Sequence, residues 1–365
     1  MSEANSMVLG TRLRKTYCIK IQEIDILKIW FDILTPKQIL FFEPMVKQFQ
    51  NSNTVICTTR NYREVNELAK IKKMKMIKVG SHGGSTKIGK LVASLNRGVS
   101  LGKIIQRINP DIAISFCSPE ASRVAFGLGI RHIAFSDSPH AEAVMRLSLP
   151  FVNKLLIPWI IPKKEFTKYG IGEKNIIQYK AIDAAAIIKN SQKITQRKKS
   201  KKKILIRLEE EQAAYVQKNN HTLKLIQRIA DKFPTHEILI LPRYRSQISE
   251  LKKNLDCKVR VLSEVVNGNE LLQQVNVFVG SGGTMTAEAA LLGIPTISYN
   301  AVPNLVQDYL VRRKLVILES NPDKITTIIE KFFSSDNYAI EKNAKKVLMS
   351  MEDPYKKLIQ VIKNK

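Results

Sequence analysis

The strongest constraint on the fold is a regular alternation of short apolar runs with longer segments of helical period, which begins near Leu27. Strand–helix alternation of this kind indicates a parallel sheet with helices on both faces. In the first half, the predicted strands are Lys28–Ile33, Thr54–Thr58, Met74–Val79, Asp111–Phe116 and His132–Phe135, and the predicted helices span 37–50, 61–72, 86–108 and 119–128.

The alternation is interrupted once and then starts again. A proline-broken stretch that ends at Pro162 and a basic run at 193–203 enclose a region of weak periodicity. Strands are predicted again at Lys203–Leu208, Glu237–Leu241, Lys258–Leu262, Val275–Val279 and Thr296–Tyr299, and helices at 322–335 and 337–363. The 365 residues suffice for two domains with separate cores. We therefore predict an α/β protein with two doubly wound Rossmann-like domains that face a central cleft.

The interruption divides the chain into four parts. Residues 1–27 contain neither an apolar core nor the small-residue cleavage site of a secretory signal, so they do not indicate one. We predict a poorly ordered N-terminal extension there, either disordered or loosely docked; a start site placed too early is the alternative. We place the first Rossmann-like domain at 28–180 and a basic linker at 181–203. The second domain, with the C-terminal helices, is placed at 204–365.

The sequence lacks the marks of a metal protein, a disulfide-rich protein or a membrane-spanning protein. The four cysteines form no CxxC pair, and the five histidines form no HxxxH or HExxH spacing. The nearest candidate for a membrane span, Leu147–Pro162, is short, contains Lys154 and is cut by prolines. We expect no bound metal, no cofactor and a location in reducing cytoplasm.

The charge of the chain is unusual, with 59 Lys and Arg against 32 Asp and Glu, a net +27. Such an excess indicates an anionic partner: nucleic acid, an anionic lipid surface or a phosphate-bearing substrate. The basic run 193–203 is most simply a solvated linker. It has no interleaved aromatic residues, and no nucleic-acid-binding motif is present, so a nucleic-acid partner is disfavoured.

A glycine-rich turn lies within Val277–Tyr299, where a predicted strand ends and a helix begins. Gly282 and Gly283 permit positive φ and a close approach of the backbone to a ligand. The helix that begins near Thr284 directs N–H groups at an anion, and Thr284 and Thr286 add hydroxyl contacts or cap the helix. Ser281 is included among the predicted ligands. The turn is neither a P-loop nor a GxGxxG fingerprint, and a tight turn without a ligand fits its spacing equally well.

Glu288 follows one helical turn later, where a carboxylate can accept hydrogen bonds from two vicinal hydroxyls of a sugar. The run GGTMTAEAALLGIP resembles the nucleotide-sugar motif in the second domain of GT-B fold glycosyltransferases and of UDP-N-acetylglucosamine 2-epimerases. The resemblance implies that the glycine turn holds the diphosphate and that Glu288 holds the ribose.

From about Leu27 onward the chain resembles domain-of-unknown-function family 354, a mostly archaeal family. This resemblance implies the GT-B fold. The matching runs are WFDILTPKQILFFEP, SHGG, SFCSPEASRVAFGLGI, FSDSPHAEAVMRLSLP, LIRLEEEQAAYV, LPRY and GSGGTMTAEAALLGIPTISY.

Two further loops follow strands of the first half. Thr35 and Lys37 end the first strand, and their loop lacks the glycines that this loop often carries in GT-B enzymes; a turn with Pro36 at a helix start fits it as well. The third predicted strand leads into Ser81–Lys87. The predicted ligands for a phosphate or acceptor are Thr35, Lys37, His82, Gly83, Gly84 and Lys87.

A cluster of titratable residues follows the strand His132–Phe135. Asp137, His140 and Glu142 lie within six residues, and a carboxylate beside a histidine can tune a general base near neutral pH. A lone histidine near a helix start is more often a cap or a core residue. If the protein is an enzyme, we predict its base here.

Arginines follow the first two strands of the second half. Arg207, Arg243 and Arg245 suit bidentate contact with phosphate, although such a pair at a strand end is about as often merely solvent-exposed. The epimerases use a histidine near the second position, and none is present here.

The resemblance to GT-B enzymes implies a metal-independent glycosyltransferase with a UDP-linked sugar donor, which agrees with the missing metal motif. The basic excess and the stretch Leu147–Pro162 suit contact with the inner face of an anionic membrane that carries a lipid-linked acceptor. One alternative is a sugar-nucleotide 2-epimerase, which needs two carboxylates, such as Asp137 with Glu142 or Glu120. A second alternative is a nucleic-acid- or anionic-surface-binding protein without catalysis.

Overall fold

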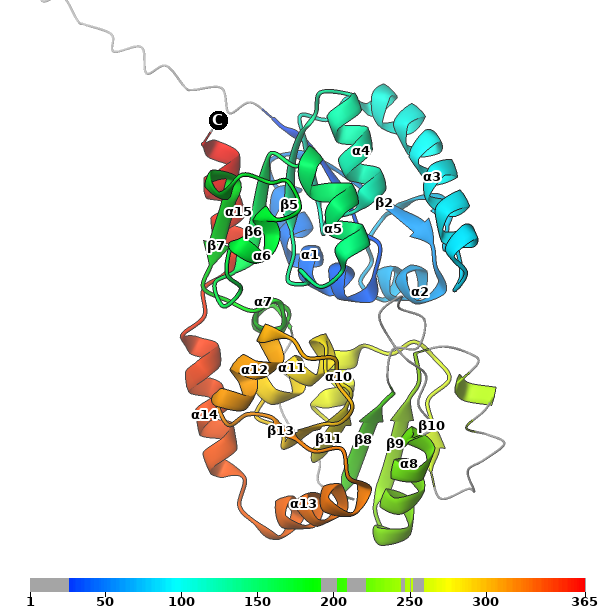
Figure 1. Cartoon of the computed structure of the whole chain (residues 1–365), viewed down its shortest axis with the longest axis vertical. Coiled ribbons are helices and arrows are strands. Elements are labelled where there is room, and N and C mark those ends of the chain that lie inside the picture. The colour runs from blue at the N-terminus through cyan, green and yellow to red at the C-terminus, as the bar shows by residue number, and fades with distance from the viewer. Residues whose placement is uncertain are drawn as a thin grey trace, which may run out of the picture.

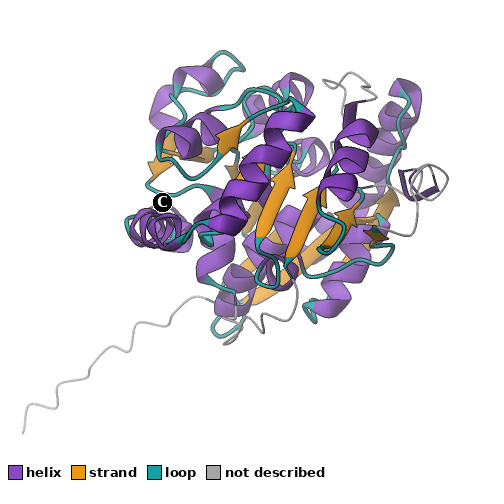
Figure 2. Cartoon of the chain, turned by 90° about the horizontal axis from the view of Figure 1, so that it is seen from below, coloured by secondary structure: helices purple, strands orange, loops and turns teal. Residues whose placement is uncertain are grey.

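The computed structural model describes residues 26–191, 202–208, 221–243, 247–249, 251 and 259–364. These residues form two parallel sheets, each covered by helices, one above the other (Figure 1). Viewed from below, helices flank the strands on both sides (Figure 2). The predicted pair of α/β halves is confirmed. Residues 1–25 of the predicted extension and most of the basic run lie outside the described residues.

The first sheet has seven parallel strands in the order β3-β2-β1-β4-β5-β6-β7. The strand order reverses between β1 and β4, the position at which doubly wound sheets form a ligand crevice. Its strands are β1 (Lys28–Asp32), β2 (Thr54–Asn61), β3 (Ile77–Ser81), β4 (Ile112–Ser115), β5 (Arg131–Phe135), β6 (Lys154–Pro158) and β7 (Ile176–Tyr179), and its helices are α1 (Pro36–Phe49), α2 (Arg63–Ile71), α3 (Lys87–Ile108), α4 (Pro119–Gly127), α5 (Glu142–Ser148), α6 (Lys164–Thr167) and α7 (Asp183–Lys189).

The second sheet has six parallel strands in the order β10-β9-β8-β11-β12-β13, which reverses between β8 and β11. Its strands are β8 (Lys203–Arg207), β9 (Glu237–Leu241), β10 (Arg260–Val261), β11 (Val277–Gly280), β12 (Thr296–Ser298) and β13 (Ile317–Leu318). The helices that follow are α8 (His221–Lys232), α10 (Gly268–Leu272), α11 (Thr284–Leu291), α12 (Leu305–Arg312), α13 (Pro322–Ser334), α14 (Tyr338–Met349) and α15 (Pro354–Lys363).

The proline-broken stretch Leu147–Pro162 forms a strand of the first sheet. Leu155, Leu156 and Ile157 of β6 are completely buried. The part of the stretch that forms β6 is therefore not available to a membrane, whereas Leu147 is 58% exposed. The suggested membrane contact stays a prediction. Among the described residues, no helix has the length and apolar character needed to cross a membrane.

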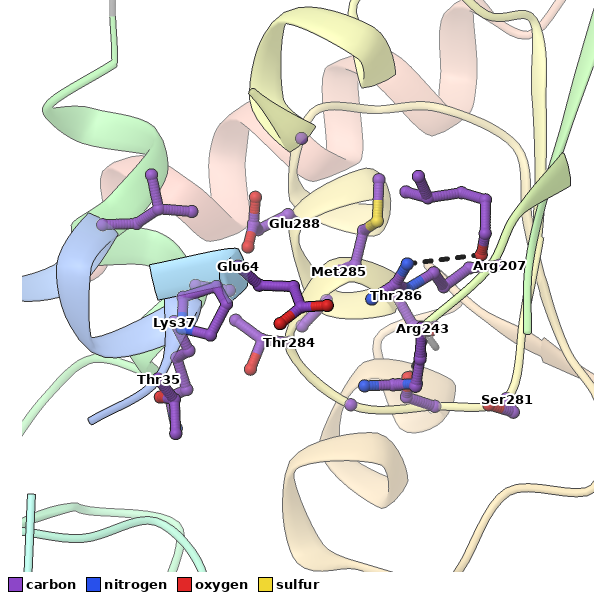
Figure 3. A pocket seen from close by; sticks show the side chains of 18 of the residues that line it. Thr35, Lys37, Glu64, Arg207, Arg243, Ser281, Thr284, Met285, Thr286 and Glu288 are labelled. Carbon is purple, nitrogen blue, oxygen red and sulfur yellow. Dashed lines mark hydrogen bonds between the residues drawn. The ribbon is translucent and has the colours of Figure 1, made fainter. Parts of the chain in front are cut away.

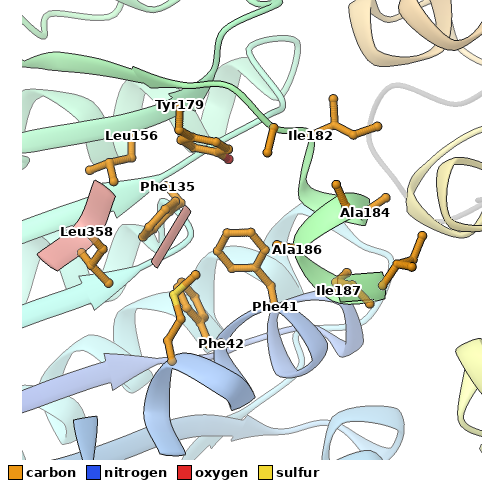
Figure 4. Packing of buried hydrophobic residues seen from close by; sticks show 14 of the residues in the cluster. Phe41, Phe42, Phe135, Leu156, Tyr179, Ile182, Ala184, Ala186, Ile187 and Leu358 are labelled. Carbon is orange, nitrogen blue, oxygen red and sulfur yellow. The ribbon is translucent and has the colours of Figure 1, made fainter. Parts of the chain in front are cut away.

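The predicted linker 181–203 begins with a buried helix. Residues 184–188 of α7 are all buried, and α7 packs against α1 of the first domain and α11 of the second. Figure 4 shows Ala184, Ala186 and Ile187 next to the aromatic core of the first sheet. The small alanine side chains allow this close packing, so α7 is a joint between the domains.

The last helix returns to the first sheet. Leu358 of α15 is completely buried in the core around Phe135, and the Tyr355 ring meets Phe49 edge-on at 5.1 Å. Arg131 donates hydrogen bonds to the carbonyl oxygens of Val361, Ile362 and Asn364, which the helix end leaves without intrahelical partners. The chain thus crosses between the domains twice.

We predict that Leu358→Ala lowers the free energy of unfolding by about 2–5 kcal/mol, because it leaves a cavity in the core. The matched control is Met349→Ala on α14, whose side chain is 73% exposed; we expect a change within about 0.5 kcal/mol. Urea denaturation measures both. Equal, small effects would show that α15 is not part of the first core.

Candidate functional site

A cleft of about 680 Å³ separates the two domains. Strand ends and helix starts of both sheets line it, as doubly wound folds lead one to expect. Figure 3 shows Lys37 and Thr35 of the first domain facing Thr284 and Glu288 of the second.

The glycine turn forms one wall of the cleft. Gly282 and Gly283 have φ of 81° and 78°, in the left-handed region that favours glycine. A Cβ on Gly282 would lie 2.7 Å from Gln307 Oε1 and 2.9 Å from the Ala301 Cβ, so a side chain there would force its neighbours to shift. The Thr286 hydroxyl donates to the Gly282 carbonyl oxygen at 2.9 Å and fixes the turn.

Helix α11 begins directly behind this turn with no side-chain cap at Gly283. The first N–H groups of a helix have no intrahelical partners, and the macrodipole places partial positive charge there. Ser281, Gly282, Gly283 and Thr284 all line the cleft. The turn can thus receive an anion.

Glu288 is a buried carboxyl group one turn into α11. Its side chain lines the cleft although the residue is only 4% exposed, and Oε2 has no hydrogen-bond partner among the described residues. Burial raises the pKa of Glu288 to about 8, against the opposing effect of the Lys37 charge. A buried acceptor without a hydrogen bond lowers the free energy of unfolding, and a ligand hydroxyl that donates to it removes this cost.

Two arginines border the same wall. Arg207 Nη1 donates to the carbonyl oxygens of Pro242 at 2.6 Å and Leu241 at 3.2 Å, and Arg243 Nε donates to that of Leu208 at 3.0 Å. These bonds hold both guanidinium groups at the edge of the cleft, which both residues line. Arg245, predicted with them, lies outside the described residues.

An ion-pair cluster forms the opposite wall. Lys37 Nζ lies 2.6 Å from Asp137 Oδ2 and 2.7 Å from Asp183 Oδ2. The Tyr179 hydroxyl donates to Asp183 Oδ1 at 2.6 Å, and Lys37 also stands 4.7 Å from the centre of the Phe116 ring. Thr35 caps α1 through the N–H of Gln38 and so positions Lys37.

The pKa values of the two carboxyl groups in this cluster are shifted in opposite directions. Burial disfavours both charged forms, but Lys37 outweighs it at Asp137 and holds the pKa of that group at about 2. At Asp183, burial and the neighbouring Asp137 charge outweigh Lys37 and raise the pKa to about 7. The paired carboxylates raise the pKa of Lys37 above its usual value, although burial opposes them.

The predicted trio Asp137, His140 and Glu142 is divided in the structure. His140 lines the cleft beside Asp137, and burial lowers its pKa, so the imidazole is mostly neutral at pH 7. Glu142 lies on the exposed surface of α5, 2.7 Å from Arg146 Nε, and does not line the cleft. The turn at the start of α5 directs it outward.

The predicted ligands in the loop between β3 and α3 are also separated in the structure: some line a cavity and others do not. His82 lines the cleft and stacks on Tyr62 at 4.9 Å, whereas Gly83 lines an adjoining pocket of about 200 Å³. Gly84 and Lys87 are exposed and line neither cavity.

Asp183 and Arg60 line the cleft but were not among the site residues predicted from the sequence. Asp183 lies within the predicted linker, and only its proximity to Lys37 in space marks it. Arg60 follows the predicted second strand and lines both cavities. The strand-end rule that selected Lys37 would have selected Arg60 as well.

The chain belongs to the family described as "Protein of unknown function (DUF354)", whose model matches residues 27–365. A relative from Methanocaldococcus jannaschii, Uncharacterized protein MJ0665, is 26% identical over 338 residues, which cover 83% of this chain and 91% of the relative.

Solved structures share the fold at low identity. The UDP-GlcNAc 2-epimerase from Neisseria meningitidis, bound to UDP-GlcNAc, has a TM-score of 0.71 at 17% identity and covers 93% of this chain and 100% of its own. The UDP-GlcNAc 2-epimerase of Methanocaldococcus jannaschii has a TM-score of 0.66 at 16% identity, with coverage of 88% and 99%. A spinosyn rhamnosyltransferase has a TM-score of 0.60 at 15% identity, with coverage of 93% and 100%. The predicted GT-B-like fold is confirmed.

We predict that Lys37→Met lowers the free energy of unfolding at pH 7 by about 3–5 kcal/mol, because it leaves buried carboxylates uncompensated. Without Lys37, burial raises the pKa of Asp137 above its unfolded-state value. The variant should therefore lose further stability as pH rises from 5 to 8 and regain it as pH falls.

The matched control is Lys47→Met on the same helix, whose amine is largely exposed beside Glu43; we expect a change of at most about 1 kcal/mol. Chemical denaturation at several pH values measures both variants. A pH-independent loss in Lys37→Met would contradict the charge account.

Proposed function

We propose that this protein binds a nucleoside diphosphate sugar in the cleft and transfers the sugar to an acceptor hydroxyl. The observation that carries the proposal is Glu288, a buried carboxyl group with an unpartnered oxygen one turn behind the glycine turn. A ribose presents two vicinal hydroxyls at a fixed spacing, and a carboxylate accepts both. Among neutral ligand groups, a diol satisfies this orphaned group best.

The glycine turn then receives the diphosphate. Phosphate oxygens accept hydrogen bonds from the N–H groups at the start of α11, and Arg243 supplies positive charge beside Gly283: its Nη2 lies 3.9 Å from the position of a Cβ on that glycine. These groups stabilise the negative charge that develops on the departing diphosphate without needing to reorganise. The proposed sites for the nucleoside and for the diphosphate are thus formed by one short segment of chain, from the glycine turn to Glu288.

The first domain supplies the acceptor side. His140 lines the cleft and is mostly neutral at pH 7, so it can take the proton of an acceptor hydroxyl. Asp137 is a weak base, because Lys37 holds its pKa at about 2. We assign Asp137 to hold Lys37 and not to proton transfer. His82 extends the acceptor side towards the adjoining pocket.

A sugar-nucleotide 2-epimerase is the second candidate. The epimerases of Neisseria meningitidis and Methanocaldococcus jannaschii have higher TM-scores than the rhamnosyltransferase, at 0.71 and 0.66 against 0.60. The cleft also contains two neighbouring carboxyl groups, Asp137 with a lowered pKa and Asp183 with a raised pKa. Product analysis separates the candidates: an epimerase converts its nucleotide sugar without an acceptor, whereas a transferase releases nucleoside diphosphate only when an acceptor is present.

We predict that a matching nucleotide sugar or nucleoside diphosphate, at about 100 times its Kd, raises the free energy of unfolding by about 2.7 kcal/mol. Glu288→Gln should lose most of this stabilisation, because a neutral amide accepts only one of the two ribose hydroxyl bonds well. A thermal-shift panel of nucleotides and nucleotide sugars, which includes UDP and UDP-GlcNAc, measures it.

Glu330→Gln is the control, since Glu330 lies on α13 with an exposed side chain. It should respond to nucleotides as the wild type does. Stabilisation of the wild type by none of the nucleotides would overturn the proposal.

A further inference from the structure

A second pocket, of about 200 Å³, adjoins the cleft where β2 and β3 end. Arg60, His82 and Lys90 line both cavities, so one ligand can extend from the cleft into the pocket. Sites that hold a whole small molecule measure about 300–1,000 Å³, so this pocket suits one terminal group of a larger ligand. None of the residues assigned above to the nucleotide sugar lines it.

Arg60 brings a positive charge to this pocket from the end of β2. Its Nε is buried and has no hydrogen-bond partner among the described residues. Burial lowers the pKa of Arg60, and the nearby Glu120 carboxylate opposes this shift. A buried donor without a hydrogen bond destabilises the fold, and an anion that accepts from it removes this cost.

The carboxylates close to the pocket form ion pairs with a second arginine. Arg97 Nη2 lies 2.5 Å from Asp32 Oδ1, and Arg97 Nη1 lies 3.5 Å from Glu120 Oε2. Arg60 and Lys90 add their charges to that of Arg97, so three cations stand against two carboxylates. The excess positive charge favours an anionic group in the pocket.

The loop from β3 to α3 orients a further hydrogen-bond donor. The Gly84 N–H donates to His82 Nδ1 at 3.1 Å, so the neutral imidazole carries its own proton on Nε2 and can donate there. The ring also stacks on Tyr62 at 4.9 Å, which fixes its plane. A Cβ on Gly83 would lie 2.5 Å from the Gly89 carbonyl oxygen, so the loop lies directly on α3.

We propose that this pocket binds a terminal phosphate group of the acceptor. The role of the bound molecule as acceptor rests on the proposed function, whereas the phosphate rests on the pocket itself. A phosphate accepts hydrogen bonds from several directions, which suits a guanidinium, an ammonium and an imidazole N–H that come from three different elements. An uncharged sugar would leave the positive charge uncompensated.

Equilibrium dialysis of the full chain against labelled inorganic phosphate tests the pocket, with UDP present so that the glycine turn does not contribute. Arg60→Gln should raise the Kd for phosphate by about 10-fold or more, because it removes a charge-assisted hydrogen bond. Ser94→Asp should weaken binding similarly, since Ser94 lines the pocket from α3 and the variant leaves Arg60 in place.

Arg107→Gln is the matched control. Arg107 is exposed in the last turn of α3 and lines neither cavity, so this variant removes the same charge without changing the pocket. Its Kd for phosphate should equal that of the wild type. Phosphate that does not bind, or that binds equally well to Arg60→Gln and Ser94→Asp, would overturn the inference.

Competing phosphate esters identify the source of the group. Glycerol phosphate represents an acceptor in solution, and phosphatidic acid in phosphatidylcholine vesicles represents one carried by a lipid; displacement of inorganic phosphate by either supports the inference. Phosphatidylserine, whose phosphate is not terminal, is the control for surface charge and should not displace it. Displacement by neither ester, or by phosphatidylserine as strongly as by phosphatidic acid, would overturn the inference.

The same measurements separate this pocket from the proposed donor site. If UDP binds and phosphate does not, the phosphate pocket fails and the donor site stands. If UDP fails to bind while phosphate binding depends on Arg60, the donor site fails and the phosphate pocket is supported.

Discussion

The contact of Lys37 with Asp137 and Asp183 organises the wall of the cleft that the first domain contributes. Lys37 begins α1, Asp137 follows β5, and Asp183 begins α7, the helix that packs against α11 of the second domain. One partly buried cation thereby joins two strand ends to the helix between the domains. Its contacts cost desolvation of all three groups, so their role is to specify one geometry more than to add stability.

This geometry sets the surroundings of Glu288. α11 is held against α7, and Glu288 therefore faces the cleft from a buried position beside the Lys37 charge. A carboxyl group with a raised pKa and an orphaned oxygen opposes folding when it is ionised. Proteins retain such groups where function requires them. The two glycines before α11 are a second such feature, because their positive φ serves the shape of the turn and disfavours other residues.

The sequence predicted what depends on local pattern. The two sheets follow from alternation, and the glycine turn and Glu288 were found because their spacing is set within one strand and one helix. Strand β6 was missed because Pro150 and Pro158 interrupt its apolar run, and strand β7 was missed because four residues are too few to show a period. Asp183 was missed because only distant residues give it a role. Glu142 was expected beside His140 on sequence proximity, yet two residues at a helix start suffice to turn a side chain away from the cleft.

Calorimetric titration with UDP tests the central claim most directly. Glu288 has a pKa of about 8 when free, and a diol stabilises its ionised form, so binding should release protons at pH 7.5. The apparent enthalpy should then differ between two buffers of unlike ionisation enthalpy, and Glu288→Gln should abolish most of that difference. An equal proton release in wild type and variant would contradict a ribose on Glu288.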